Sequence, residues 1–343
     1  MGYEGRVTSE SKRPAADPAV ISARTHNDAN YRKKNVKRLA LLDRVSHGGY
    51  FGRAAGFMLF LLALVLIFLR PLVDLVIYAV GSQLYSFILL VPFISLYLAW
   101  LRMCEGPSNL GSSPKVGLIP LTIGILVISG YYTMVRYGRK VNQNDYLSFT
   151  ICSFVAFVAS GCFMFLGRKA VTVVAFPVAF LFLLAPLPTF LTDFASDCLQ
   201  HASAVAAYFL LRLLGTPLLK DGQLFQMPGI TIEVAPQCSG IHSSLVLFIS
   251  SLVAGHLFLK SRRRRMILAL AVIPIGILRN SIRIVTISLL CVYLDPGMID
   301  SPLHHHGGPA FLALSLVPCF VLLLWLRRAE HRNEKQGLVN AEA

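Results

Sequence analysis

The chain has 343 residues, of which 55% are hydrophobic and 14% are charged, and its mean hydropathy is +0.63. Soluble domains carry roughly a quarter of charged residues, so this composition argues against an ordinary soluble protein and predicts one built for lipid. The formal net charge is +15, but the lysines and arginines gather in the first 53 residues and at the ends of apolar runs. That placement orients helices in a membrane, and it argues against a nucleic-acid partner.

The chain begins with a polar segment. Residues 1–50 are polar and basic, which predicts a disordered cytoplasmic tail. No apolar core follows Met1, so we expect no cleaved signal peptide. A polytopic membrane domain is predicted over residues 51–328, followed by a cytoplasmic C-terminal tail at residues 329–343.

Apolar runs long enough to cross a membrane recur along the rest of the chain, since each helical span takes about 20 residues. They lie at residues 54–70, 84–101, 116–135, 147–167, 170–191, 241–259, 266–291 and 309–326. Residues 71–83, where Asp74 interrupts the apolar pattern, are predicted to form a short re-entrant or interfacial piece. The predicted fold class is therefore an all-α integral membrane protein with about eight transmembrane helices.

The distribution of basic residues predicts the orientation of these spans. With eight spans, both termini lie on one side, and the segments on that side carry 24 lysines and arginines against six on the other side. Because cytoplasmic loops carry the excess of Lys and Arg, we expect both termini to be cytoplasmic. The expected location is the cell (inner) membrane, with a lipid bilayer around the spans.

The longest loop, residues 192–240, is predicted to lie outside the cytoplasm. Residues 192–214 have a mixed apolar and polar face, which is typical of a helix lying on the membrane surface. Residues 224–227 and 230–234 alternate with period two around the turn dipeptide Pro228–Gly229. This pattern predicts a short β-hairpin before the sixth span.

Cys238 follows this hairpin at the start of the sixth span. The seven cysteines show no CxxC pair and no metal-ligand spacing, so neither a metal nor a cofactor is expected. In the run Gln237–Cys238–Ser239–Gly240–Ile241, the glycine permits close approach of a helix or a substrate. A cysteine at a helix start can become a reactive thiolate beside a cation, although an isolated cysteine is more often an inert packed thiol.

A cationic group is available on the seventh span. Arg283 lies well inside that span, and Arg279 and Asn280 share its helical face. If the span ends near Tyr293, Arg283 lies ten residues inside, about 15 Å deep at 1.5 Å per residue. Intramembrane arginines are usually functional; the alternative is a buried structural cation paired with an acidic residue such as Asp193, Asp197 or Glu233.

Three consecutive histidines, His304, His305 and His306, directly precede the last span. Consecutive residues rarely converge on one ion, and no HExxH pattern accompanies them. One histidine acting as general acid and base beside a thiolate is the better interpretation. In this interpretation Cys238 is the nucleophile, one histidine transfers the proton, and Arg283 stabilises the oxyanion.

These motifs together resemble the exosortase/archaeosortase family. The resemblance rests on Gln237–Ile241, on Asn280–Ile284, on His304 with Gly308 four residues later, and on Tyr85–Ser86–Phe87 upstream, and it covers about residues 50–328. It implies a membrane-embedded cysteine transpeptidase with Cys238 as nucleophile, Arg283 as transition-state stabiliser and His304 as acid and base. Its implied partners are exported proteins that end in a sorting motif such as Pro-Glu-Pro, one transmembrane helix and a basic tail, together with an unknown acceptor nucleophile.

This chain departs from the family pattern in two places. Gln237 stands where an acidic residue often precedes the cysteine, and Phe87 stands where histidine is usual. The triple histidine also leaves the acid and base role open among His304, His305 and His306.

Other functions are compatible with the same composition. A transporter or channel subunit could use Arg283 to bind an anionic solute, although no pair of broken helices in matching halves indicates one. A metal-dependent intramembrane protease would need ligands that the spans do not supply, and a non-catalytic scaffold is a further alternative.

Overall fold

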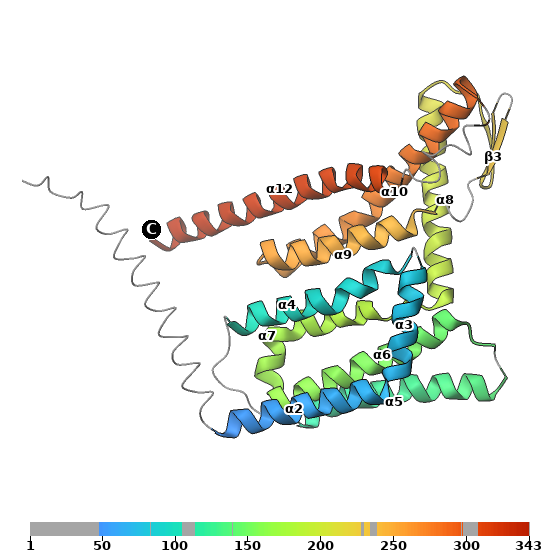
Figure 1. The fold of residues 1–343 in the computed structure, drawn as a ribbon. Helices are drawn as coiled ribbons and strands as arrows, with labels where there is room; N and C mark the ends of the chain where they lie inside the picture. The colour runs from blue at the N-terminus through green and yellow to red at the C-terminus, as the bar shows by residue number, and fades with distance from the viewer. Residues whose placement is uncertain are drawn as a thin grey trace, which may run out of the picture.

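The structure is a computed structural model that describes residues 48–82, 84–104, 114–138, 140–227, 230–233, 239–295, 297 and 308–342. Most of these residues are helical, and most of the helices lie side by side with their axes roughly aligned (Figure 1). The helices, in chain order, are α2 (Gly48–Ile67), α3 (Leu69–Gly81), η1 (Ser86–Leu90), α4 (Val91–Cys104), α5 (Pro114–Arg136), α6 (Gln143–Gly161), the π-helix η2 (Cys162–Leu166), α7 (Gly167–Phe180), η3 (Leu181–Leu184), α8 (Thr189–Leu213), α9 (Ile241–Phe258), α10 (Arg262–Tyr293) and α12 (Gly308–Glu342).

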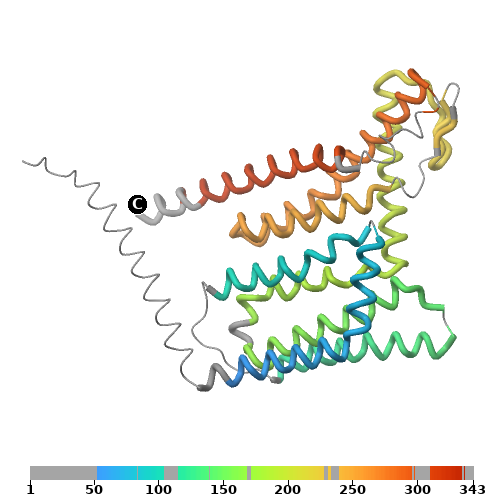
Figure 2. Tube along the Cα trace, viewed as in Figure 1, coloured from blue at the N-terminus to red at the C-terminus, as the bar shows by residue number. Residues whose placement is uncertain are grey.

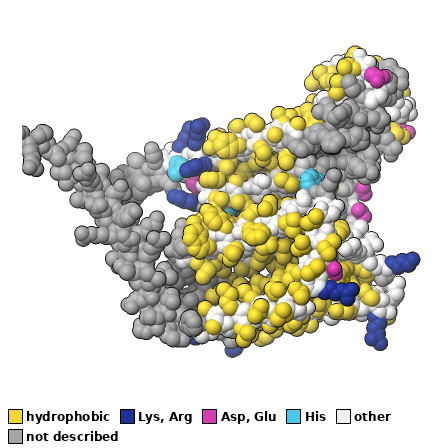
Figure 3. Space-filling view, in the orientation of Figure 1, with side chains coloured by type: hydrophobic (Ala, Val, Ile, Leu, Met, Phe, Trp, Pro, Cys, Tyr) yellow, Lys and Arg dark blue, Asp and Glu magenta, His cyan; other side chains and the backbone are white. Residues whose placement is uncertain are grey.

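The membrane-spanning architecture expected from the sequence is confirmed. Among the described residues, six helical segments are long and apolar enough to cross a membrane, and there are eight spans if each of two bent helix pairs counts as one. The first coloured turns of α2 and the last coloured turns of α12 lie at the same end of the bundle (Figure 2). In Figure 3 the flanks of the helices form a broad hydrophobic surface, and most charged side chains in view lie towards the ends.

Two helices run across the ends of the others rather than along them (Figure 1). Helix α3 is bent by 69° from α2, and α8 is bent by 92° from the segment Val171–Leu184. The α8 bend falls at Ala185–Pro188, where two prolines interrupt the helical hydrogen bonding. These helices cover the residues for which the sequence predicts an interfacial piece and a surface helix, and their position relative to the membrane stays a prediction.

A polar network holds the bend before α8 in place. The Asp145 carboxylate accepts a hydrogen bond from the Thr189 backbone N–H at 2.7 Å, and the Asn144 amide donates to the Leu187 carbonyl at 2.7 Å. The hydroxyl of Tyr85, which is 3% exposed, donates to the same carbonyl at 3.3 Å. Helix α6 and the segment before η1 therefore fix the direction in which α8 leaves the bundle.

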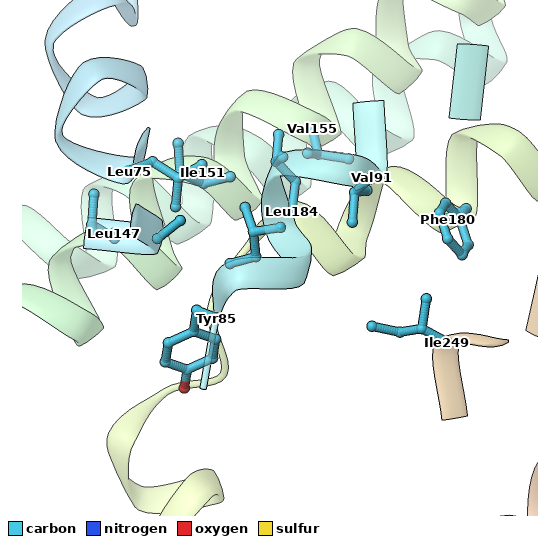
Figure 4. Packing of buried hydrophobic residues seen from close by; sticks show 11 residues of the cluster. Leu75, Tyr85, Val91, Leu147, Ile151, Val155, Phe180, Leu184 and Ile249 are labelled. Carbon is cyan, nitrogen blue, oxygen red and sulfur yellow. The ribbon is translucent and has the colours of Figure 1, made fainter. Parts of the chain in front are cut away.

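The buried side chains behind this bend form one apolar cluster (Figure 4). It joins α3, η1, α4, α6, α7 and η3, and Ile249 adds α9 to it. Its buried members are Leu75, Ala79, Tyr85, Ile88, Val91, Leu147, Ile151, Val155, Phe180, Leu184 and Ile249. The cluster therefore connects the first half of the helices to α9.

Three short strands form an antiparallel sheet in the order β1–β2–β3, with β1 at Leu219–Asp221, β2 at Leu224–Met227 and β3 at Ile230–Glu233. The predicted hairpin is confirmed, because β2 pairs antiparallel with β3, with Met227 opposite Ile230. Strand β1 was not predicted. Phe225, Met227 and Ile232 pack against α8 and the last turns of α10, which fixes the sheet to these two helices.

The opposite end of the bundle carries a separate polar cluster. The His256 ring stacks on Phe176 with a centroid separation of 3.9 Å, Arg102 Nε lies 3.3 Å from its Nε2, and Arg265 Nη1 lies 3.2 Å from its Nδ1. The Glu330 carboxylate accepts hydrogen bonds from two backbone N–H groups of the α9–α10 turn. These contacts tie α4, α7, α9, α10 and α12 together at that end.

Candidate active site

Gly240 directly precedes α9 and has a left-handed backbone, with φ of +70°. Glycine adopts this conformation without the steric cost that a Cβ atom would impose. A Cβ built on Gly240 would lie 2.6 Å from Nη2 of Arg279 and 3.2 Å from Oδ1 of Asn280. The glycine therefore permits both the turn into α9 and the close approach of α10.

Arg279 occupies the space that the glycine leaves. Its Nη2 donates a hydrogen bond of 3.0 Å to the Gly240 carbonyl and lies 3.4 Å from Oγ of Ser244. Arg279 is 4% exposed and Asn280 is 2% exposed. The guanidinium thus reaches across from the middle of α10 and holds the residue from which α9 begins.

Close contact between α8 and α10 places this part of α10. Ser281 is fully buried, and its hydroxyl lies within hydrogen-bond distance of two carbonyls, that of Ser203 on α8 at 3.0 Å and that of Ile277 on its own helix at 2.7 Å. The facing positions on α8 are small, with Ala204 and Ala207 fully buried. Small residues let two helix backbones approach closely, so Arg279 and Arg283 lie at the level where α8 crosses the bundle.

The last turns of α10 pack against α8 and the sheet through Ile284, Val285 and Ile287. The depth of about 15 Å for Arg283 stays a prediction; the whole of Arg262–Tyr293 is long and apolar enough to cross a membrane. Arg283 is partly exposed and lies one helical turn after Arg279, near the end of the bundle.

Ser239 brings α8 into the same region. It is 3% exposed, and its Oγ lies 3.5 Å from Oγ of Ser196 on α8. Gln200, one turn further along α8, donates to the side chain of Gln223 at 2.6 Å beside the sheet. The start of α9, the middle of α10 and the first half of α8 therefore converge around Ser239 and Gly240.

The structure describes five of the predicted site residues: Arg283, Asn280, Arg279, Ser239 and Gly240. It brings Arg279, Asn280 and Gly240 into direct proximity. Cys238 and the histidines His304, His305 and His306 lie outside the described residues, as does Gln237. By sequence, Cys238 is the residue before Ser239, and the histidines precede α12.

Two comparisons with known proteins give no match: no curated protein and no solved structure is similar to the chain at a significant level. The sequence model of the transmembrane exosortase family matches residues 79–321, more than two thirds of the chain. The chain belongs to the transmembrane exosortase family. The matched region of this exosortase begins in α3, ends in α12 and includes all of the predicted site residues.

The exosortase fold also shows contacts that the sequence analysis missed. Ser196 and Ser244 touch the site from α8 and α9, and neither belongs to a recognisable motif. The Asn144–Asp145 pair at the start of α6 is a typical helix-start signal and could have been recognised in the sequence. Its role in holding α8 depends on the three-dimensional approach of Thr189. Among the described residues, no group of three or more His, Cys, Asp or Glu side chains could hold a metal ion.

Proposed function

We propose that this exosortase is a membrane-embedded cysteine protease and transpeptidase that cleaves C-terminal sorting signals of exported proteins. Its family membership supports a protease-like or transpeptidase-like role in a membrane. The observation that carries the proposal is the contact between Arg279 and Gly240. It holds the segment that follows Cys238 against the helix that bears both arginines, where a thiolate and a developing oxyanion need cations.

The proposed reaction has two covalent steps. The Cys238 thiolate attacks the carbonyl carbon of the scissile peptide bond, and Arg283 stabilises the oxyanion that forms. The C–N bond then breaks, a histidine gives its proton to the leaving amine, and a thioester remains on Cys238. In the second step an amine or water attacks the thioester, the histidine accepts its proton, and the C–S bond breaks to restore the thiolate. His304 is our first choice for the histidine, with His305 and His306 as the alternatives.

The proposed substrate is an exported protein that ends in a short motif, one transmembrane helix and a basic tail. Both termini of the enzyme are proposed to be cytoplasmic, with the reaction on the opposite side of the inner membrane. This orientation rests on the excess of Lys and Arg in the segments on the side of the termini. Accessibility of tags at either terminus to a protease, before and after membrane permeabilisation, tests it.

Processing of a tailed substrate in membranes tests the catalytic roles. We expect Cys238→Ala to abolish processing and Arg283→Ala to lower its rate by about 10²–10³-fold, the usual cost of losing an oxyanion donor. Among single alanine changes at the three histidines, one variant should be inactive. Membrane insertion of each variant, monitored with a fluorescent tag, must stay normal. Undiminished processing by the Cys238→Ala variant would refute the proposal.

A trapping experiment tests the thioester itself. Hydroxylamine added during turnover should release the substrate fragment as a hydroxamate, which mass spectrometry detects. The alkylation test uses a variant in which Cys104 and Cys198 are replaced; Cys198 is exposed among the described cysteines. In that variant, alkylation of Cys238 should block processing. Continued processing after complete alkylation of Cys238 would show that Cys238 is not the nucleophile.

A further inference from the structure

His256 lies between two arginines, at the end of the bundle opposite the candidate active site. Nε of Arg102 lies 3.3 Å from Nε2 of the imidazole, and Nη1 of Arg265 lies 3.2 Å from Nδ1. Arginine nitrogens only donate hydrogen bonds, and a neutral imidazole has one acceptor nitrogen and one N–H. Whichever tautomer His256 adopts, one of the two contacts therefore joins an N–H to an N–H. The two arginines together bring one more donor to the ring than the ring can accept.

Packing holds this mismatch in place. The His256 ring is 6% exposed and lies parallel to the Phe176 ring, with 4° between the two planes. Nε of Arg265 also donates a hydrogen bond of 2.8 Å to the Leu259 carbonyl, which fixes that guanidinium. Arg102 and Arg265 are themselves partly exposed. An anion can therefore reach the two guanidinium groups and supply the acceptor that the imidazole lacks.

Further cations surround the two arginines, on the α9–α10 turn and on the part of α12 that faces it. They are Lys260, Arg262, Arg263, Arg264, Arg327, Arg328 and Arg332. Glu330 is the only acidic residue in the sequence ranges 256–270 and 320–333, and its oxygens accept hydrogen bonds from the backbone N–H groups of Lys260 and Ser261. Figure 3 shows Lys and Arg side chains gathered at this end of α9 and α12. The local charge therefore favours an anionic ligand.

Exposed apolar side chains lie beside these cations. The Arg327 guanidinium lies 5.8 Å from the centre of the Phe258 ring. Leu257, Phe258 and Trp325 are all exposed on the flanks of α9 and α12. Cations at the end of a span, next to apolar groups on its flank, match the phosphate and the acyl chains of a phospholipid. A free phosphate ion would use only the cations.

We propose that Arg102 and Arg265 bind the phosphate of an anionic phospholipid, with its acyl chains on the adjacent apolar flank. The planar fork of each arginine matches phosphate oxygens, and His256 holds the two guanidinium groups on either side of one ring. Arg102 belongs to α4 and Arg265 to α10, so the lipid joins the first half of the helices to the second. This binding site lies away from the candidate active site and does not depend on the proposed function.

Binding of short-chain phosphatidylglycerol to the full-length protein in detergent tests this site. The comparisons are phosphatidylcholine, whose headgroup has no net charge, and inorganic phosphate. We expect phosphatidylglycerol to raise the thermal unfolding midpoint and to bind at least tenfold more tightly than phosphatidylcholine, as measured by native mass spectrometry. Inorganic phosphate at the same concentration should leave the midpoint unchanged. Equal binding of the two lipids, or an equal shift with inorganic phosphate, overturns the assignment of an anionic lipid.

Two double variants remove the same charge from the same end of the bundle. Arg102→Gln with Arg265→Gln removes the pair beside His256, and the two lipids should then bind within twofold of each other. Arg263→Gln with Arg328→Gln removes two exposed arginines and should keep the preference. Equal losses in both variants, or no loss in the first, overturn the inference, because general surface charge then explains the binding.

Thermal unfolding without lipid checks that the variants are folded. If Arg102→Gln with Arg265→Gln does not fold, Arg265→Lys carries the comparison, because it keeps the charge and removes the planar fork. Phosphatidylglycerol should then bind at least threefold more weakly than to the unchanged protein. Undiminished binding to the Arg265→Lys variant overturns the inference.

Discussion

Nη2 of Arg279 donates a hydrogen bond to the carbonyl oxygen of Gly240 at 3.0 Å, across 39 positions of the sequence. This contact links the middle of α10 to the residue from which α9 begins. It makes the path of the chain just after Cys238 dependent on a charged side chain of another helix. Changes at either residue should therefore affect the activity more than they affect the fold.

Replacement of Gly240 by alanine tests this dependence. The new Cβ would lie 2.6 Å from Nη2 of Arg279, so the guanidinium must move away from the carbonyl. The left-handed backbone adds a strain of order 1–3 kcal/mol. We expect processing of a tailed substrate to fall at least tenfold, together with a lower thermal unfolding midpoint.

Gly215 provides the matched control for Gly240→Ala. It has a similar φ of +79°, but a Cβ there meets nothing within 4 Å. Gly215→Ala should lower the unfolding midpoint by a similar amount and leave processing nearly unchanged. Equal losses of processing in the two variants would show that backbone strain, not the arginine contact, is responsible.

The crossing of α8 and α10 predicts a size limit at Ser281. Its hydroxyl lies within hydrogen-bond distance of the Ser203 and Ile277 carbonyls, and its side chain is fully buried. Ser281→Ala should cost about 0.5–1.5 kcal/mol, the net worth of one hydrogen bond. Ser281→Leu should separate the helices, cost about 1–3 kcal/mol through overpacking, and reduce processing further. Both effects are measured in parallel by thermal unfolding and by substrate cleavage, and a leucine variant as active as the alanine variant contradicts the expectation.

The bend before α8 should depend on Asp145. Its carboxylate accepts a hydrogen bond from the first N–H of α8 at Thr189, as a capping residue does. Asp145→Ala should lower the stability by about 1 kcal/mol, and Asp145→Asn, which keeps an acceptor oxygen, by less. Asp193→Ala, at an exposed position on α8, is the control. Thermal unfolding in detergent distinguishes them, and equal midpoints for the Asp145→Ala and Asp193→Ala variants would argue against the cap.

Packing between α2 and α6 should be sensitive to a single methyl group at Gly161. A Cβ there would lie 2.5 Å from the Phe60 ring, whereas a Cβ at Gly130 on α5 meets nothing within 4 Å. We expect Gly161→Ala to cost about 1–3 kcal/mol by overpacking. Gly130→Ala should be neutral or slightly stabilising, because alanine favours a helix over glycine. Matching unfolding midpoints for the two variants would contradict the close packing of α2 on α6.

The sequence was sufficient to predict the helical architecture because hydropathy reports burial in lipid directly. It predicted about eight spans, where the described residues hold six to eight candidates, and it predicted the hairpin of β2 and β3. It did not predict β1, a three-residue strand whose pairing with β2 is a tertiary contact rather than a local pattern. It also did not predict that Ile284, Val285 and Ile287 face the sheet, because these side chains are apolar whether they face lipid or protein.

The candidate site was only partly predictable for a related reason. Arg279 and Asn280 were recognisable as polar groups in an apolar run, and Gly240 as a small residue beside Cys238. The contact between Arg279 and Gly240 depends on how α9 and α10 cross, and no local pattern specifies that crossing. Ser196 and Ser244 could not be identified at all, because an isolated serine in a helix has no distinguishing neighbours.

Helix α10 carries the two arginines and, without a break, the side chains that pack against the sheet. An α-helix turns by about 100° per residue, so the angle between the arginine face and the sheet-binding face is set by the number of residues that separate them. One residue inserted after Arg283 would rotate the sheet and the strand β3 away from the arginines. The number of residues between Arg283 and the sheet-binding side chains thus determines how the charged site is oriented relative to β3, the strand that precedes Cys238 in the sequence.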